Sequence, residues 1–262
     1  MLKNIKIAKN ISPIEQKRIH LQEKFITMTK RQDNSTPSDI IAKLSPISDL
    51  LTEEQKAELQ ASVVIKKYKK NEIMYEEGDV PQYLHCLISG KVKIYKEGVG
   101  GRNQIVHIFK PVEFFGFRAY MANENYITSA AAFEPTTLCI IPVTLFEKWL
   151  SENLQLANYV IRLCSVEIGI LNRHIVSLTQ KHLRGRIAES LLFLKETYGM
   201  EEDNQTISAR FSRADLADLS NMTTSNAIRT LSAFSSENIL EVNGRKIKIL
   251  DENQLKKISK IG

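Results

Sequence analysis

The sequence predicts an α+β protein made of three successive parts. Short alternating runs punctuated by turn residues fill the stretch from Val63 to Pro142, which is typical of a roll or barrel of β-strands. From Leu145 to Gln180 the apolar spacing becomes helical. Residues 211–250 then read as a helix, a tight turn, a second helix and a short hairpin. The predicted order is therefore a β-roll, a long helix and a winged helix-turn-helix.

A polar, basic segment precedes the predicted roll. Residues 1–39 hold eight Lys and Arg against four Asp and Glu, and they end in the loop-like run QDNSTPSD. We expect a mobile arm or a loose short helix there, and Met28 is an alternative start of translation. A helical pattern then covers about residues 40–61.

Composition limits the class of protein. With 262 residues, 43% of them hydrophobic, the chain can bury two modest cores, and a net charge of +6 favours a polyanionic partner. Cys86, Cys139 and Cys164 stand singly among apolar residues, which favours reduced thiols over zinc or an iron–sulfur cluster. No uninterrupted apolar run reaches the ~20 residues that cross a bilayer, and residues 1–10 lack a secretory core. We predict a cytoplasmic protein without a membrane partner.

The long helical stretch repeats its apolar residues every seven positions over four heptads. The first position of each heptad is Leu154, Ile161, Ile168 or Ile175, and the position three residues on is Ala157, Cys164, Leu171 or Leu178. β-Branched residues at the first position favour two-stranded coiled coils, and this seam spans ~40 Å. A single buried core helix is the alternative, since it is also apolar on one side. We predict that the seam is a dimer interface.

The first helix of the terminal motif is predicted to begin after Ser212, whose hydroxyl can cap free backbone N–H groups. Leu216 and Leu219 are spaced to point inward, and the small Ala217 lies where a second helix crosses closely. Asn221 fits the turn, because Asn tolerates a left-handed backbone.

The second helix carries the predicted recognition face. Thr223 or Thr224 caps it, and its buried stripe is predicted to hold Ile228 and Leu231. The opposite, outward face holds three polar residues: Thr224, Ser225 and Arg229. A guanidinium can bind guanine O6 and N7 with two hydrogen bonds, while hydroxyls serve bases or phosphates. This face is therefore a candidate for reading DNA bases.

Residues 239–250 alternate as a hairpin around Asn243-Gly244, a strong short hairpin signal. Further candidate DNA contacts are Thr223 and the basic residues of this wing and of the first helix: Arg213, Arg245, Lys246 and Lys248. The alternative is a helical pair and hairpin that merely pack, with Arg229 in solvent. Because capping, turn and wing signals occur together, a DNA-reading unit is favoured.

Symmetry connects the long helix to this unit. Two chains paired along the helix place two recognition helices on one side, about 34 Å apart, as successive major grooves require. The predicted partners are a second copy and double-stranded DNA with a near-palindromic operator. The competing interpretation is a β-roll ligand-binding or protein-interaction module without specific DNA binding.

Several segments, taken in order, resemble one family. They are YKKNEIMYEEGDVPQYLHCLISGKVKIYKE with QIVHIFKPVEFFG, then LRGRIAESLLFL, then the terminal motif. Residues 41–255 thereby resemble the cyclic-AMP receptor protein and fumarate-nitrate regulator (Crp/Fnr) superfamily of bacterial transcription factors. The resemblance implies a cyclic-nucleotide-binding-like sensor roll at 40–144, a dimerisation helix at 145–180 and a DNA-binding domain at 181–262. It also implies that an effector repositions the reading domains.

The candidate effector pocket departs from the family's pattern. Cyclic-nucleotide binders use a Gly-Glu pair for the ribose and an Arg followed by Ser or Thr for the phosphate. Here the pair is Gly116-Phe117, and Ile127 stands where the Arg is expected, which leaves Thr128 alone. Cyclic AMP is therefore not the expected effector.

Three further positions belong to the candidate pocket: two where the family binds adenine, and one that is a candidate replacement site for an anion. The long-helix positions that carry hydroxyls in cyclic-AMP binders fall at Leu171 and Asn172. Arg118 lies next to the missing Glu and is either an anion ligand or an ordinary paired arginine. The run FFGFRAYM either lines a pocket for a less polar effector or fills the space, in which case DNA binding is constitutive.

Other sensing chemistry has little support. Three scattered cysteines cannot supply a four-cysteine iron–sulfur site. His85, His107 and His174 are available as haem ligands, but a lone His among strand apolars is more often a core residue, so haem stays an unsupported option.

The sequence lacks the common catalytic motifs and carries one acidic run. The chain has no Gly-rich phosphate loop followed by Lys, no nucleophile elbow and no His-Glu metal helix, so we predict a non-enzyme. The acidic run Glu201–Gln205 is either an ordinary solvated turn or a patch for RNA polymerase.

Overall fold

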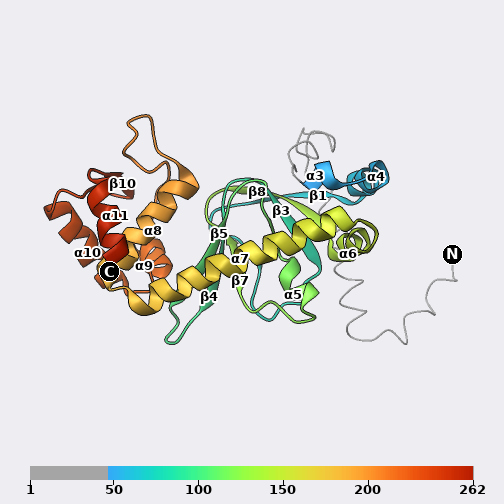
Figure 1. Ribbon diagram of the computed structural model, residues 1–262, viewed down its shortest axis with the longest axis horizontal. Helices are drawn as coiled ribbons and strands as arrows, with labels where there is room; N and C mark the ends of the chain where they lie inside the picture. The colour runs from blue at the N-terminus through green and yellow to red at the C-terminus, as the bar shows by residue number, and fades with distance from the viewer. Residues whose placement is uncertain (1–46, 262) are drawn as a thin grey trace, which may run out of the picture.

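The computed structural model describes residues 47–261 of the chain. A β-roll and a C-terminal helical domain lie at different positions along one long helix, α7 (Leu154–Gln180) (Figure 1). This order confirms the predicted α+β architecture. The predicted basic arm at residues 1–39, with Met28, lies outside the described residues.

Two short helices, α3 (Ile47–Leu50) and α4 (Glu53–Ser62), precede the roll. Thr52 caps α4 by accepting from the backbone N of Gln55, whose side chain accepts in return from the backbone N of Thr52. Such a reciprocal pair satisfies two backbone donors that the first turn of a helix leaves free. The described part of the predicted helical stretch is therefore two helices separated by a cap.

The roll consists of two four-stranded antiparallel sheets. One has the order β1-β8-β3-β6 and contains β1 (Val64–Tyr68), β8 (Thr136–Pro142), β3 (Tyr83–Ser89) and β6 (Phe114–Phe115). The other has the order β2-β7-β4-β5 and contains β2 (Ile73–Tyr75), β7 (Ser129–Ala132), β4 (Val92–Glu97) and β5 (Asn103–Phe109). Leu87, Val92 and Leu138 are buried together, so residues of both sheets share one core. The predicted strand region is confirmed.

The expected helix from Leu145 to Gln180 is interrupted. α6 (Val143–Glu152) ends at Asn153, which then caps α7 by accepting from the backbone N of Leu156 at 3.0 Å. The same Asn153 amide donates to the carbonyl of Leu50 at 2.8 Å and to the Gln55 side chain at 2.9 Å. The prediction of a single continuous helix was therefore wrong. The Asn153 side chain interrupts it, because its hydrogen bonds cap α7 and hold α3 and α4 at the same corner.

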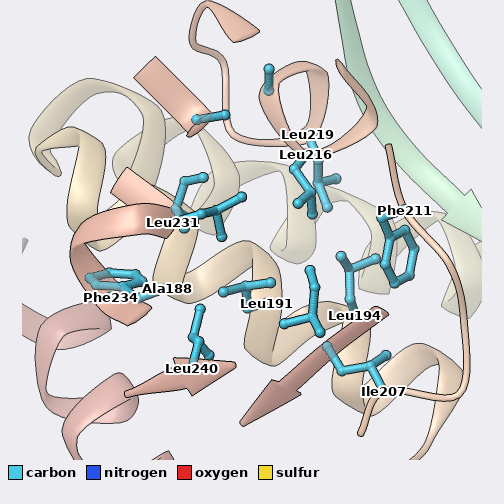
Figure 2. Packing of buried hydrophobic residues seen from close by; sticks show 14 of the residues in the cluster. Ala188, Leu191, Leu194, Ile207, Phe211, Leu216, Leu219, Leu231, Phe234 and Leu240 are labelled. Atoms are coloured by element: carbon cyan, nitrogen blue, oxygen red, sulfur yellow. The ribbon is translucent and has the colours of Figure 1, made fainter. Parts of the chain in front are cut away.

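The C-terminal domain, called the reading domain below, comprises residues 183–261. Its elements are α8 (Leu183–Tyr198), α9 (Arg213–Leu219), α10 (Thr224–Ser236), β9 (Leu240–Asn243), β10 (Lys246–Ile249) and α11 (Glu252–Ile261). Figure 2 shows its core, where Leu191 and Leu194 of α8 face Leu216, Leu231 and Phe234. α11, absent from the predicted order, packs against α8.

The reading domain is docked on the roll. Ile105 and Ile108 of β5 and Phe133 belong to the same buried cluster as the reading domain's core. The rings of Phe133 and Phe211 lie 6.0 Å apart between centroids. Because apolar surface from both parts leaves water together, this contact fixes the orientation of α9 and α10 relative to the roll.

Candidate DNA-reading interface

The first helix of the motif, α9, begins as the sequence predicts. The Ser212 hydroxyl accepts from the backbone N of Asp215 at 3.0 Å, and the Asp215 carboxylate accepts from the backbone N of Ser212 at 2.9 Å. Leu216 and Ala217 are almost fully buried, and Leu219 is buried as well. Ala217 keeps the crossing with α10 close, because a larger side chain has no room at such a contact.

The turn between the helices depends on Asn221. Its φ is +49°, in the left-handed region that Asn tolerates better than most residues, as the sequence predicts. The guanidinium Nη1 of Arg186, on α8, donates to the Asn221 carbonyl at 2.7 Å. Sequence reasoning gave Arg186 no role, although it lies within the segment LRGRIAESLLFL. Its contact holds the turn and therefore the start of the recognition helix.

The recognition helix, α10, is capped by Thr223, whose hydroxyl accepts from the backbone N of Asn226 at 3.2 Å. Thr224, Ser225 and Arg229 are exposed together on its outer face. Among residues 47–261 the Arg229 side chain has no hydrogen bond or ion pair. The structure thus leaves all three predicted base-reading residues free: Ser225 and Arg229, four positions apart, share the outer face, and Thr224 is exposed at its edge beside the start of the helix.

One prediction about α10 was wrong. The apolar spacing predicts Ile228 on the buried stripe with Leu231, yet Ile228 is 46% exposed, whereas Leu231 is buried. The buried stripe instead contains Ala227, Thr230 and Phe234. Residues 227, 230, 231 and 234 follow the three- and four-residue spacing of one helix face, and residue 228 lies one position outside it. Ile228 therefore belongs to the edge of the outer face.

The wing is a two-stranded hairpin whose tip is shifted by one residue from the prediction. Asn243 pairs with Lys246, so Gly244 and Arg245 form the two-residue loop, instead of Asn243 and Gly244. Gly244 has a φ of +59°, and it occupies the first central position, where hairpin turns of the II′ type require Gly. Arg213 Nη2 donates to the Gly244 carbonyl at 3.0 Å and so ties α9 to the tip.

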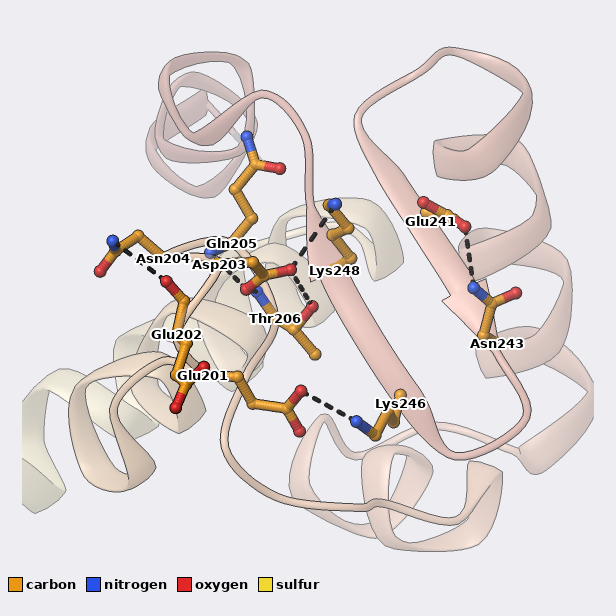
Figure 3. Close-up of polar contacts among 10 residues, drawn as sticks. All are labelled: Glu201, Glu202, Asp203, Asn204, Gln205, Thr206, Glu241, Asn243, Lys246 and Lys248. Carbon is orange, nitrogen blue, oxygen red and sulfur yellow. Dashed lines mark hydrogen bonds and ion pairs between the residues drawn. The ribbon is translucent and has the colours of Figure 1, made fainter.

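The two wing lysines contact the acidic run Glu201–Gln205, here called the acidic loop, as Figure 3 shows. The Nζ of Lys246 lies 2.8 Å from a carboxylate oxygen of Glu201, and that of Lys248 lies 3.6 Å from Asp203. Hydrogen bonds from Thr206, its side chain first, hold the pKa of Asp203 well below its usual value. The acidic loop is therefore an organised neighbour of the wing, and this pairing over more than forty residues has no sequence signal.

The predicted dimer seam lies on an open side of α7. The first heptad positions Leu154, Ile161, Ile168 and Ile175 are 75%, 64%, 59% and 58% exposed, and Leu171 is 44% exposed. Ala157, Cys164 and Leu178 are partly buried. By length and composition alone α7 could also cross a membrane, the one such helix in the described part of the chain. Arg162, Glu167 and Arg173 interrupt its apolar surface.

The residues of the candidate effector pocket are not gathered into one site within this chain. Gly116, with a φ of +91°, precedes α5 (Phe117–Met121), and Phe117 is buried against Phe146. Arg118 forms an ion pair of 2.6 Å with Glu124, which agrees with the paired alternative. The Thr128 side chain lies against the Tyr75 hydroxyl. Leu171 and Asn172 lie exposed on α7.

Aromatic rings occupy the region beside Gly116. Tyr75 and Tyr126 stack with centroids 3.7 Å apart, and His85 stacks on Phe115 at 5.0 Å. A Cβ on Gly116 would lie 2.7 Å from His85 Nδ1, so this packing needs glycine. Sequence reasoning considered the run FFGFRAYM but missed the tyrosine pair, whose members are far apart in sequence.

The candidate haem ligands and the cysteines differ in burial: His85, Cys86 and Cys139 are buried, and His107, His174 and Cys164 are partly buried. Burial lowers the pKa of both His85 and His107 to about 4, which keeps both neutral. His107 Nδ1 lies 3.4 Å from a Glu167 carboxylate oxygen. Burial raises the pKa of the Cys86 and Cys139 thiols, which keeps them protonated and unreactive.

The fold and the reading face together define a DNA-binding regulator with a sensor-like roll. Comparison with protein families agrees, because residues 65–153 match the cyclic nucleotide-binding domain and residues 185–258 match the Crp-like helix-turn-helix domain. The chain is 28% identical to the transcriptional activator protein anr of Pseudomonas aeruginosa, over 71% of this chain and 77% of that protein. It is 26% identical to the anaerobic regulatory protein of Aggregatibacter actinomycetemcomitans, over 74% and 76%.

A solved structure shares the whole architecture. A putative transcriptional regulator of the Crp/Fnr family from Eubacterium rectale superposes with a TM-score of 0.71 at 20% identity, covering 83% of this chain and 99% of that one. The chain therefore belongs to the Crp/Fnr superfamily. It is a transcription regulator of that type with a helix-turn-helix DNA-binding domain.

Proposed function

We propose that the protein binds near-palindromic operators as a homodimer and reads bases with the outer face of α10. The observation that carries this proposal is the exposure of Thr224, Ser225 and Arg229 in the N-terminal half of a capped helix. Recognition helices contact bases with residues of this part of the helix. Arg229 keeps all its donors available for a guanine.

The exposed seam of α7 supports the homodimer. Leu154, Ile161, Ile168 and Ile175 form a row of large apolar side chains, each more than half exposed in the single chain. A second copy of α7 buries the same row from both sides, because two-stranded coiled coils match first positions with first positions. A dimer therefore covers the exposed apolar surface of the seam, and no membrane is needed to explain it. The dimer places its two reading domains for successive major grooves.

Phosphate contacts are assigned to the wing and to α9. Arg245 at the wing tip is exposed and forms no ion pair within residues 47–261, so it is the wing residue most available to DNA. Arg213 holds the tip through Gly244 while its remaining donors stay available. Lys246 and Lys248 reach phosphate only by exchanging their acidic partners.

The effector, if one is used, is not cyclic AMP bound by the usual contacts. The ribose-binding Glu is replaced by the buried Phe117, and the phosphate-clamping Arg by Ile127, which is 48% exposed. Thr128 lies against the Tyr75 hydroxyl, and Arg118 is paired with Glu124. The polar side chains left near the family's nucleotide site therefore already have partners within the roll. This supports either another effector or constitutive DNA binding. We place this non-enzymatic regulator in the cytoplasm, with RNA polymerase a candidate partner of the acidic loop.

The test is DNA binding by the full chain, measured by fluorescence anisotropy at two salt concentrations. Arg229→Ala should cost about 1–3 kcal/mol and relax the base preference at one position of each half-site. Arg102→Ala, which removes an exposed arginine from the roll, is the matched control and should leave binding unchanged. Binding that is indifferent to both salt and Arg229 would support the competing interaction module and refute base reading by α10.

A further inference from the structure

A cavity of about 230 Å³ lies where the reading domain meets the roll. The roll contributes Lys70, Phe133 and Glu134, and the reading domain contributes Tyr198, Ala209, Arg210 and Phe211. This junction cavity shares no residue with the candidate pocket around Gly116 or with the recognition face. We propose that it binds a single-ring aromatic anion, which ties the reading domain to the roll.

The charge around the junction cavity favours an anion. Lys70 and Arg210 come from opposite domains, both are exposed, and neither forms an ion pair within the described range 47–261. The lining carboxylate of Glu134 lies 3.8 Å from the Nζ of Lys91, so a third cation already balances it. The lining therefore carries unbalanced positive charge on two sides. A guanidinium can bind a carboxylate or phosphate with two parallel hydrogen bonds.

The walls of the junction cavity suit a flat apolar group. The Tyr198 ring meets Phe211 edge to face at 5.2 Å, and Phe133 lies 6.0 Å from Phe211 between ring centroids. Aromatic rings prefer such edge and offset contacts with a further ring. A cavity of ~150 Å³ is large enough for benzene, so 230 Å³ holds one ring and an acidic group.

An unpaired hydroxyl supplies a donor. The Tyr198 hydroxyl is buried and has no hydrogen-bond partner among the described residues. Burial raises the pKa of Tyr198, so the hydroxyl keeps its proton at neutral pH. A buried donor without an acceptor is unfavourable, and because Tyr198 lines the junction cavity we assign an oxygen of the bound anion as that acceptor, reached by a small shift of the ring. The unpaired donor and the two unpaired cations are the features expected of a site for an anion.

A ligand bound in the junction cavity would stabilise the docking of the reading domain on the roll. A ligand that touches Lys70 and Arg210 at once binds only while the reading domain is docked on the roll. By linkage, such a ligand stabilises the docked arrangement in proportion to its affinity. The protein would then carry an effector site at the junction, separate from the family's nucleotide position.

The test is calorimetric titration of the full chain with phenyl phosphate, with inorganic phosphate and phenol as probes of the anion and the ring alone. We expect saturable binding of phenyl phosphate that is clearly tighter than binding of either fragment. The double variant Lys70→Gln/Arg210→Gln should weaken it about tenfold. Lys69→Gln, which removes a neighbouring exposed charge outside the cavity, should leave it unchanged.

Tyr198→Phe provides a second variant that keeps the ring. It should weaken phenyl phosphate several-fold, while the melting temperature of the unliganded protein stays the same or rises, because no hydrogen bond is lost. The proposal is overturned if phenyl phosphate does not bind saturably, if it binds the double variant equally well, or if inorganic phosphate binds as tightly. No DNA is needed, so this outcome is independent of the operator proposal.

Discussion

The recognition face of α10 and the family's nucleotide position in the roll are built in opposite ways. Both carry an arginine and a threonine. On α10, Arg229 and Thr224 are exposed, and Arg229 has no partner within residues 47–261. In the roll, Arg118 is bonded to Glu124 at 2.6 Å, and the Thr128 side chain lies against the hydroxyl of the partly buried Tyr75. The recognition face therefore leaves its hydrogen-bond donors free for a partner molecule, whereas the polar side chains of the roll are paired within the chain.

This difference shows where binding chemistry remains in the molecule. A side chain that is already paired must lose that partner before it binds a ligand, whereas a free side chain exchanges only water. The α7 seam belongs with the recognition face, because its apolar residues are also left uncovered. The following substitutions test this contrast between the exposed surfaces of α7 and α10 and the roll, where aromatic side chains fill the space beside Gly116. The roll is called filled in this sense below.

Ile161→Asp should give the largest effect. A carboxylate in the centre of the predicted seam would be buried without a partner in the dimer, which costs about 3–5 kcal/mol. We expect a monomer in analytical ultracentrifugation and a loss of operator binding. Val166→Asp is the control, because Val166 is similarly exposed but lies on the side of α7 away from the seam. A stable Ile161→Asp dimer would contradict the seam.

Gly116→Ala tests whether the roll is filled. The new Cβ would lie 2.7 Å from His85 Nδ1, at a φ of +91° that L side chains rarely adopt. We expect a loss of about 3 kcal/mol in urea unfolding. Gly78→Ala has the same φ of +91° but no atom within 4 Å of its Cβ, so it should lose only about 1 kcal/mol. Equal losses would show that packing beside Gly116 is loose.

Acid should destabilise the filled roll through His85. Burial lowers its pKa to about 4 in the folded protein, whereas an unfolded chain has an ordinary value near 6.5. Between these values the unfolded chain binds the proton more readily, so stability is full above about pH 6.5 and falls towards pH 4. His85→Gln should reduce the loss between pH 8 and pH 5 by about 2 kcal/mol. An unchanged pH slope would indicate that His85 is accessible to protons.

Glu201→Gln should give the smallest effect and sharpen the account of the wing. Removing the carboxylate 2.8 Å from Lys246 frees that lysine for phosphate. The pair is partly exposed, so we expect DNA affinity to rise only about two- to threefold at low salt. Glu202→Gln removes an adjacent exposed charge that forms no ion pair within residues 47–261. If both variants bind DNA equally, Glu201 does not compete with phosphate.

Local signals in the sequence predicted the reading domain well. The capping residue Ser212, the left-handed Asn221 and the hairpin each depend on a few neighbouring residues, and the structure has all three. The placement of Ile228 failed, because a small error in the assumed phase of a helix moves a residue from its core to its edge.

Contacts between residues that are far apart along the chain could not be predicted from the sequence. Asn153 interrupts the long helix because it bonds to Leu50 and Gln55, about a hundred positions away. The pairing of the acidic loop with the wing and the stacking of Tyr75 on Tyr126 likewise depend on the tertiary fold. The periodicity of apolar residues does not predict such contacts, because each joins segments that come together only in the folded chain.

Selection of bound sites from a random DNA pool tests the central claim most directly. A homodimer with two reading domains should enrich an inverted repeat whose half-sites are centred about 10 base pairs apart, one helical turn. Scrambling one half-site of the selected sequence should then lower affinity by at least about tenfold. Enrichment of single half-sites, or an affinity that survives the scrambling, would contradict paired reading by two α10 helices.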